Sequence, residues 1–128
     1  MPDLGSAAGF YPAQAPIDAY GDGGFRFANM SHRGSLLVLP GGIHAWAATS
    51  AAALTVADFD YLLAERERIE FVLLGTGPTQ IFPLLALRQA FETAGVGLEP
   101  MSTGAAARTF NVLLAEGRKV AAALIAVA

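Results

Sequence analysis

The most constraining feature of the sequence is a regular alternation, from Leu54 onward, between segments with helical spacing and short apolar runs. Apolar residues recur three or four positions apart in the helical segments, and each apolar run has the length of a buried strand. The predicted elements are a helix over 55–68, a strand over 71–74, a helix ending at 95, a strand over 97–101, a helix over 103–117 and a strand over 119–127. This order predicts an α/β domain with a largely parallel or mixed sheet.

The three predicted helices carry start and stop signals. Thr55 and Asp58 have the spacing of a capping box, Thr103 can cap the third helix, and Gly95 and Gly117 follow the second and third helices as stops. Pro83 is expected in the first turn of the second helix, because deeper inside it would remove a backbone hydrogen bond. The expected inward faces are Val56, Phe59 and Leu63, then Leu84, Leu87 and Phe91, then Ala107, Phe110 and Leu114.

The first third of the chain predicts additional strands. The stretch "IDAYGDGGFRF" indicates a β-hairpin, "GSLLVLP" a strand covered on both faces, and "GGIHAWAAT" a further strand that begins at a Gly41-Gly42 turn. Residues 1–16 are rich in Pro, Gly and Ala, which predicts a mobile arm, although Phe10 and Tyr11 could dock onto the body. Residues 17–128 are therefore predicted to form one domain, with a mixed sheet, packed helices and an N-terminal hairpin region.

Composition and charge exclude several classes of function. The net charge is −3 and the eight basic residues are scattered, which argues against nucleic-acid binding. The absence of cysteine excludes disulfides and thiolate chemistry. The first basic residue is Arg26, so no presequence is predicted, and the apolar stretch 120–128 is far shorter than the roughly 20 residues of a membrane-spanning helix. Together these features predict a soluble cytoplasmic protein.

The low charged fraction has two interpretations. Charged residues make up 15% of the chain and hydrophobic residues 54%, whereas about 25% charged residues is usual. An apolar surface for a protein partner or for a homodimer would explain these values. A core rich in Ala and Gly would explain them equally, without exposing large side chains.

The candidate ligand site lies where two strands are expected to end. If the strands over 71–74 and 97–101 are parallel, their following loops lie at one edge of the sheet, beside the start of the third helix. Backbone N–H groups and helix N-termini favour anions at such edges. Arg108 and Asn111, three positions apart, are expected on one helix face. The candidate residues are Gly75, Thr76, Gly77, Ser102, Thr103, Arg108 and Asn111.

A purely structural interpretation of this edge stays open. The stretch "GTGPTQ" lacks the lysine of a phosphate-binding P-loop, and Gln80 occupies the position of the third glycine in the dinucleotide-binding pattern. A glycine pair after a strand is common in an ordinary strand-to-helix turn. Arg108 and Asn111 would, on this interpretation, hydrogen-bond neighbouring loop carbonyls.

No catalytic constellation is recognisable. His32 is expected in an exposed loop, and His44 on a strand beside Trp46 on the same face. The two histidines lack metal-ligand spacing, and no Gly-x-Ser-x-Gly elbow marks a nucleophile. The remaining candidates are acidic and are expected to form a solvated helix face: Asp58, Asp60, Glu65 and Glu67. We therefore predict no catalytic residue, metal or cofactor. The sequence favours a non-enzymatic protein over an enzyme, and both interpretations stay open.

Several stretches together resemble the Mth938-like (DUF498) domain family. They are "YGDGGFRF", "GSLLVLP", "FVLLGTG" and, most specifically, "MSTGAAARTFN" followed by "EGRKVAAAL". The resemblance extends from about Ile17 to the C-terminus. It implies a single α/β domain with a mixed sheet and an added hairpin region. It also implies a protein without assigned enzymatic activity. Eukaryotic relatives of the family include a mitochondrial assembly factor for respiratory complex I.

The resemblance extends to individual positions of the candidate edge. The recurrent Gly-x-Gly and Thr…Thr-x-Asn positions of the family match Gly75, Gly77, Thr103, Thr109 and Asn111 here. Where family members often have a basic residue after the second loop glycine, this chain has Pro78-Thr79, which implies weaker anion binding.

Two functional hypotheses follow. The first is a non-enzymatic adaptor or assembly factor that acts through an unknown protein partner in membrane-complex biogenesis. The alternative is a small-molecule or anion-binding domain that uses the Gly75–Gly77 loop and the start of the helix after Thr103. This alternative includes an unrecognised enzyme.

Overall fold

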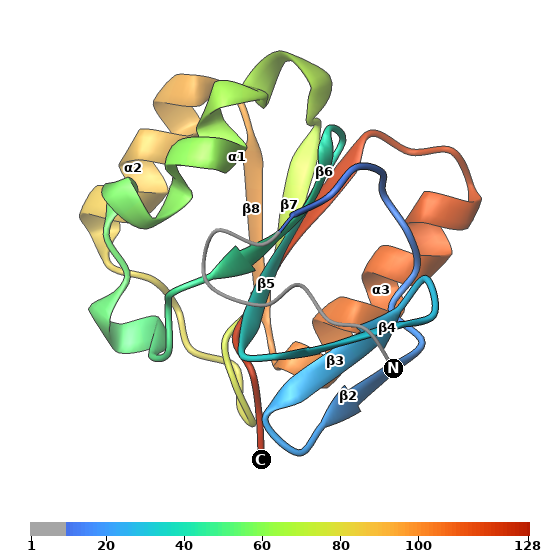
Figure 1. Ribbon diagram of the computed structural model, residues 1–128. Helices are drawn as coiled ribbons and strands as arrows, with labels where there is room; N and C mark the ends of the chain where they lie inside the picture. Colours follow the sequence, from blue (N-terminus) through green and yellow to red (C-terminus); the bar gives the residue numbers. More distant parts are fainter. Residues whose placement is uncertain (1–9) are drawn as a thin grey trace.

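A six-stranded mixed sheet forms the centre of the computed structural model, which describes residues 10–128 (Figure 1). Its strand order is β1-β6-β5-β9-β7-β8, and a second sheet has the order β2-β3-β4. The strands are β1 (Phe10–Tyr11), β2 (Ala19–Gly21), β3 (Gly24–Phe27), β4 (Met30–Arg33), β5 (Ser35–Leu39), β6 (Gly42–Trp46), β7 (Phe71–Gly75), β8 (Gly97–Met101) and β9 (Val120–Leu124). The α-helices are α1 (Asp60–Ala64), α2 (Leu85–Ala94) and α3 (Thr103–Ala115). This architecture confirms the predicted α/β domain with a mixed sheet.

The central strands of the large sheet are buried on both faces. β7 pairs in parallel with β8 and with β9, whereas β5 pairs antiparallel with β6 and β9. Every residue of β5 and β9 is buried, which explains why these strands are continuous apolar runs without alternation. Three consecutive alanines, 121–123, lie within β9, so part of the high apolar content belongs to a core of small side chains.

Two hydrophobic cores lie on opposite faces of this sheet. Helices α1 and α2 cover one face, where Phe59, Leu62 and Phe91 pack together. Helix α3 and the three-stranded sheet cover the other face, where Phe27 and Phe110 are fully buried (Figure 1). The molecule is therefore layered, with the small sheet and α3 side by side on one face.

The predicted hairpin forms, and a third strand extends it. β2 and β3 pair around the Asp22-Gly23 turn, as expected. Ala28 and Asn29 then adopt positive φ angles of 48° and 60°, which turns the chain into β4. The prediction of an exposed loop around His32 is wrong, because His32 lies on β4 and is only 4% exposed. The Ala-Asn turn is a weaker hairpin signal than Asn-Gly, which is why the sequence does not predict β4.

The helix predicted over 55–68 is broken into three short pieces. Val56–Phe59 and Arg66–Arg68 are 3₁₀ turns that flank α1. Thr55 and Asp58 do cap the segment, since the Thr55 N–H donates to the Asp58 carboxylate at 2.8 Å. The break falls at Glu65, whose carboxylate accepts hydrogen bonds from the Gly41 N–H at 2.7 Å and from Arg68 at 2.6 Å.

This break changes which side chains face the core and the solvent. Phe59 and Leu62 point inward, whereas Val56 is exposed and Leu63 is only partly buried. The expected inward stripe of Val56, Phe59 and Leu63 is therefore wrong at Val56, whereas Phe59 is buried and Leu63 packs against the core. The side chain of Glu65 is 19% exposed, so this residue does not belong to a freely solvated acidic face.

The other helix boundaries are close to those predicted. α2 begins at Leu85, so Pro83 precedes the helix instead of lying in its first turn as predicted, and Gly95 ends the helix with a φ of 76°. Leu84 lies outside the helix and is 63% exposed, so its predicted place in the core is wrong. Ser102, rather than Thr103, is the N-cap of α3, and its hydroxyl accepts from the Ala105 N–H at 3.4 Å.

The described part of the predicted arm contacts the body. Phe10–Tyr11 pairs antiparallel with β6, and the Gln14 side chain donates to the Val120 carbonyl at 2.8 Å. The remainder of the predicted arm, residues 1–9, lies outside the described residues.

Candidate functional site

The two loops of the candidate site meet at one edge of the large sheet. β7 and β8 are parallel and end in register at Gly75 and Met101. Beyond these residues the Thr76 N–H donates to the Met101 carbonyl at 2.9 Å, and the Thr103 N–H donates to the Gly77 carbonyl at 2.8 Å. The glycine loop and the start of α3 are thus brought together as the parallel pairing predicts.

Two threonine hydroxyls organise this edge. The Thr103 hydroxyl, which is 0% exposed, accepts from the Gly77 N–H at 3.0 Å and donates to the Ile125 carbonyl at 2.6 Å. The Thr76 hydroxyl donates to the Thr79 carbonyl at 2.6 Å and accepts from the Ile81 N–H at 3.0 Å. Each hydroxyl therefore holds a loop closed, and each both donates and accepts within the chain.

Gly75 is required by the close approach of β7 and α3. A Cβ atom at this position would lie 2.9 Å from the Cα of Thr103, a distance that real Cβ atoms essentially never show. The neighbouring Ser102 hydroxyl caps α3. These contacts are those of a tightly packed strand-to-helix turn, and ligand binding at this edge stays a prediction.

Arg108 and Asn111 connect α3 to the hairpin rather than to the glycine loop. The Arg108 guanidinium donates to the Tyr20 hydroxyl at 2.9 Å. The Asn111 side chain accepts from the Ile17 N–H and donates to the Ile17 carbonyl, both at 2.8 Å. The Asn111 side-chain amide thereby forms a pair of hydrogen bonds with the Ile17 backbone, as a residue of a neighbouring strand would. The structure thus separates these two residues from the other five candidates.

An exposed apolar segment follows the glycine loop. Phe82 is 70% exposed, and Ile81, Leu84 and Leu85 are also exposed. The segment is held in place, because the Ile81 N–H bonds to Thr76 and the Gln80 side chain donates to the Pro100 carbonyl at 2.8 Å. Four large apolar side chains within five residues form a local patch of the kind that protein partners cover. We call residues 81–85 the apolar segment.

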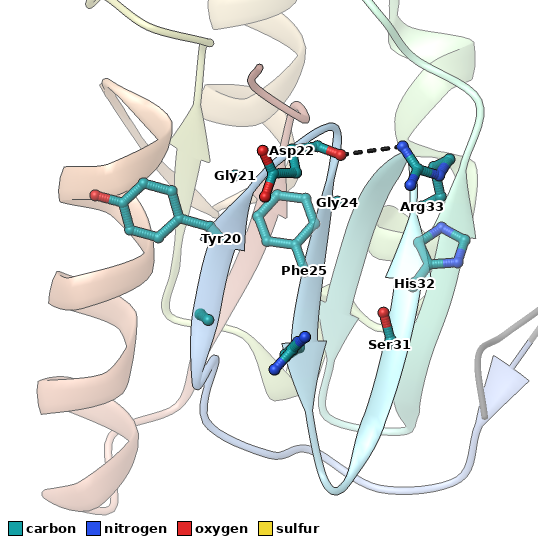
Figure 2. Close-up of a pocket in the computed structure, with 10 residues that line it drawn as sticks. Tyr20, Gly21, Asp22, Gly24, Phe25, Ser31, His32 and Arg33 are labelled. Atoms are coloured by element: carbon teal, nitrogen blue, oxygen red, sulfur yellow. Dashed lines mark hydrogen bonds between the residues drawn. The ribbon is translucent and has the colours of Figure 1, made fainter. Parts of the chain in front are cut away.

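A hollow of about 470 Å³ lies on the three-stranded sheet (Figure 2). Its lining includes Arg26 and Arg33, together with Gly21, Gly24 and Asp22. Figure 2 shows the one hydrogen bond drawn there, from Arg33 Nη1 to the Asp22 carbonyl oxygen at 3.1 Å. The sequence does not predict this hollow, because residues 30–33 have the pattern of a loop. Once residues 30–33 pair with 24–27 as strands, the two-residue period of a strand places both arginines on one face.

The environment of His44 is aromatic and partly buried. Its ring stacks on Tyr61 with centroids 4.8 Å apart. Burial lowers the pKa of His44 below 6.5, and the nearby Glu65 carboxylate opposes that shift. As predicted, His44 and Trp46 lie on the same face of β6. The Trp46 indole N–H donates to the Asp58 carbonyl at 2.8 Å. Among residues 10–128, no group of three His, Cys, Asp or Glu side chains could hold a metal ion.

Comparison with known proteins finds one matching family and several proteins of similar sequence. Residues 17–125 match the family described as a protein of unknown function (DUF498/DUF598). The chain is 44% identical to an uncharacterised protein of Rhodobacter capsulatus over 113 residues, covering 86% of this chain and 83% of that protein. It is 32% identical to NADH dehydrogenase (ubiquinone) 1 alpha subcomplex assembly factor 3 of Mus musculus over 117 residues. That match covers 90% of this chain but only 62% of the assembly factor.

A solved structure agrees with the fold over almost its whole length. The crystal structure described as an outer membrane protein from Bartonella henselae has a TM-score of 0.89 and 49% sequence identity, covering 92% of this chain and 99% of that one. None of the helices in the described part of the present chain has both the length and the apolarity to cross a membrane. On these similarities of sequence and fold, the chain belongs to the DUF498 family, the Mth938-like family that its motifs resemble.

Proposed function

We propose that this protein is a non-enzymatic assembly factor that acts through a protein partner during biogenesis of a membrane complex. The relatives named NADH dehydrogenase assembly factor 3 support this role and suggest that complex as the first target. The proposal includes action in the cytoplasm without a nucleic-acid partner, in keeping with the net charge of −3 and the scattered basic residues.

The apolar segment is the structural observation that supports a protein partner. Ile81, Phe82, Leu84 and Leu85 lie in a connection between β7 and α2 whose backbone is tied down by Thr76 and Gln80. A segment held in place in this way loses little conformational entropy when it binds. Aromatic and aliphatic anchors such as Phe82 commonly contribute most to an interface. An apolar surface on an assembling subunit is therefore the occupant we assign to the segment.

The experiment is complementation of a strain that lacks this protein. Assembled NADH dehydrogenase is measured on native gels with an in-gel activity stain. We expect the deletion to reduce the assembled complex and to accumulate subassemblies, and the wild-type chain to restore it. A Phe82→Ser/Leu85→Ser variant should fold and fail to restore assembly. Val112→Ser is the matched control, because Val112 is equally exposed on α3, away from the segment. Normal assembly in the deletion strain would overturn the proposal.

A second candidate function is binding of a small ligand at the Gly75–Thr103 edge, with catalysis there left open. It is favoured by the convergence of the glycine loop and the start of α3, although the Gly77 and Thr103 N–H groups already donate within the chain. A thermal-shift screen against metabolites, nucleotides and anions tests it. A hit whose amide chemical shifts concentrate at residues 75–77 and 102–103 would support this site. The homodimer that the composition allows is tested separately by sedimentation equilibrium.

A further inference from the structure

The outer face of the three-stranded sheet presents two arginines above a floor of small residues. The strand register places Ala19, Arg26 and Ser31 in one row, and Gly21, Gly24 and Arg33 in the next row. Phe25 and Phe27 alternate with these residues and are buried in the core, so the two rows face away from it. Arg26 and Arg33 are diagonal neighbours across β3 and β4, within reach of one ligand.

Neither arginine is neutralised by a carboxylate of the described residues. Among the described residues, the ion pairs join Arg68 to Glu65 and Arg118 to Glu70, and neither pair includes a residue of this face. Arg33 donates to the backbone carbonyl of Asp22, which leaves its charge uncompensated. Asp22 is the acidic side chain that lines the hollow, and it forms no ion pair with either arginine. Two exposed cations close together repel each other, so an anion between them is stabilised.

Glycine makes the hollow. Gly21 and Gly24 leave the second row without side chains beside Arg33, and Ala19 contributes only a methyl group to the first row. A Cβ atom at Gly24 would collide with the backbone carbonyl of His32, so glycine there is fixed by strand packing. The resulting space of about 470 Å³ is in the range of small-molecule sites.

We propose that this hollow, which we call the arginine face, binds a small anionic ligand through its carboxylate or phosphate groups. The guanidinium groups of Arg26 and Arg33 would each donate paired N–H bonds to the ligand's oxygens, because a planar guanidinium matches carboxylates and phosphates bidentately. The Ser31 hydroxyl, in the same row as Arg26, supplies a further donor. The arginine face is distinct from the apolar segment and from the Gly75–Thr103 edge, so its test is independent of the functions proposed above.

The test uses the purified full chain and two probes, inorganic phosphate and succinate, at constant ionic strength adjusted with chloride. Binding is followed through amide chemical shifts in ¹H–¹⁵N spectra. We expect saturable shifts concentrated in residues 19–33 for at least one probe. Saturation by phosphate alone would identify a phosphate ligand, and saturation by succinate alone a dicarboxylate. The absence of saturable shifts with both probes would overturn the proposal.

One substitution can introduce a competing carboxylate on the arginine face without removing either arginine. Ala19 is exposed and lies directly opposite Arg26, so Ala19→Glu places a carboxylate where the ligand's would lie. We expect Ala19→Glu to weaken binding about tenfold or more, which is the usual effect of losing one charge-assisted contact. Ala19→Gln is the matched control, with the same shape and no charge, and it should bind nearly as well as the wild type.

A second pair of variants protects the conclusion against folding defects. Arg26→Gln should lose binding to a similar extent, whereas Arg88→Gln, an exposed arginine on α2, should not. Unchanged binding in both Ala19→Glu and Arg26→Gln would show that the arginine face is not the site. Equal loss in Arg88→Gln would show only non-specific attraction of anions to basic residues, and it too would overturn the proposal.

Discussion

At the scale of single residues, Thr103 has the largest structural role at the candidate edge. Its buried hydroxyl joins the Gly77 N–H to the Ile125 carbonyl, and so connects the glycine loop, α3 and the residue that follows β9. A hydroxyl can donate and accept at once, which no apolar side chain of the same shape can do. Thr103 therefore explains the precise closure of this edge without requiring a ligand.

Thr103→Val tests this role. The substitution keeps the shape but leaves a buried N–H and a buried carbonyl without their partner, so we expect a loss of about 3 kcal/mol in the free energy of unfolding. The measurement is urea denaturation. Thr103→Ser, which keeps the hydroxyl and loses one methyl group, should cost only about 1 kcal/mol. Equal losses in the two variants would show that packing, rather than the hydrogen bonds, matters here.

At the scale of elements, α3 holds the three-stranded sheet through Asn111. The side-chain amide exchanges two hydrogen bonds with the backbone of Ile17, just before β2. Asn is a poor helix former, so its place in the middle of α3 is explained by this tertiary contact. The identity of the partner could not be predicted, because it is 94 residues away along the chain.

Asn111→Ala is expected to loosen this attachment. Losing two neutral hydrogen bonds costs about 2 kcal/mol, and the better helix propensity of Ala returns about 0.6 kcal/mol, so the net loss is roughly 1.5 kcal/mol. Hydrogen exchange of the Ile17 amide should accelerate more than exchange in β7. Val112→Ala, at the next and exposed position of α3, should change neither quantity measurably. Unchanged protection of Ile17 in Asn111→Ala would contradict this role.

The elements also show how far the sequence predicts this fold. The buried strands β5, β7 and β9 follow from their apolar runs, whereas β1 lies in the predicted arm and was not expected as a strand. The meeting of the two loops follows from parallel pairing. Long-range contacts decided the rest. The predicted first helix is interrupted at Glu65, which the Gly41 N–H holds from another part of the chain. β4 is a strand because β3 is beside it, since Met30–Arg33 has little strand pattern of its own.

At the scale of the whole molecule, the two cores share the same strands. On β5, Leu37 and Leu39 face the core of α1 and α2, whereas Leu36 and Val38 face the core of α3 and the small sheet. A strand cannot lose its neighbours on one face and keep its place on the other. The described domain is therefore expected to unfold as one cooperative unit, although its two cores are separate clusters.

Phe110→Ala tests this coupling with a probe on the opposite face. The single tryptophan, Trp46, packs against Phe59 in the first core, whereas Phe110 is fully buried in the second. Removing a buried phenylalanine ring costs about 3–5 kcal/mol. We expect the urea midpoints from Trp46 fluorescence and from far-UV circular dichroism to fall together.

The control is Leu62→Ala, which lies in the same core as Trp46. It should also lower the fluorescence and dichroism midpoints, and the two midpoints should fall by equal amounts. If Phe110→Ala moves the dichroism midpoint and leaves that of Trp46 unchanged, the two faces unfold separately. The shared strands would then not be sufficient to couple them.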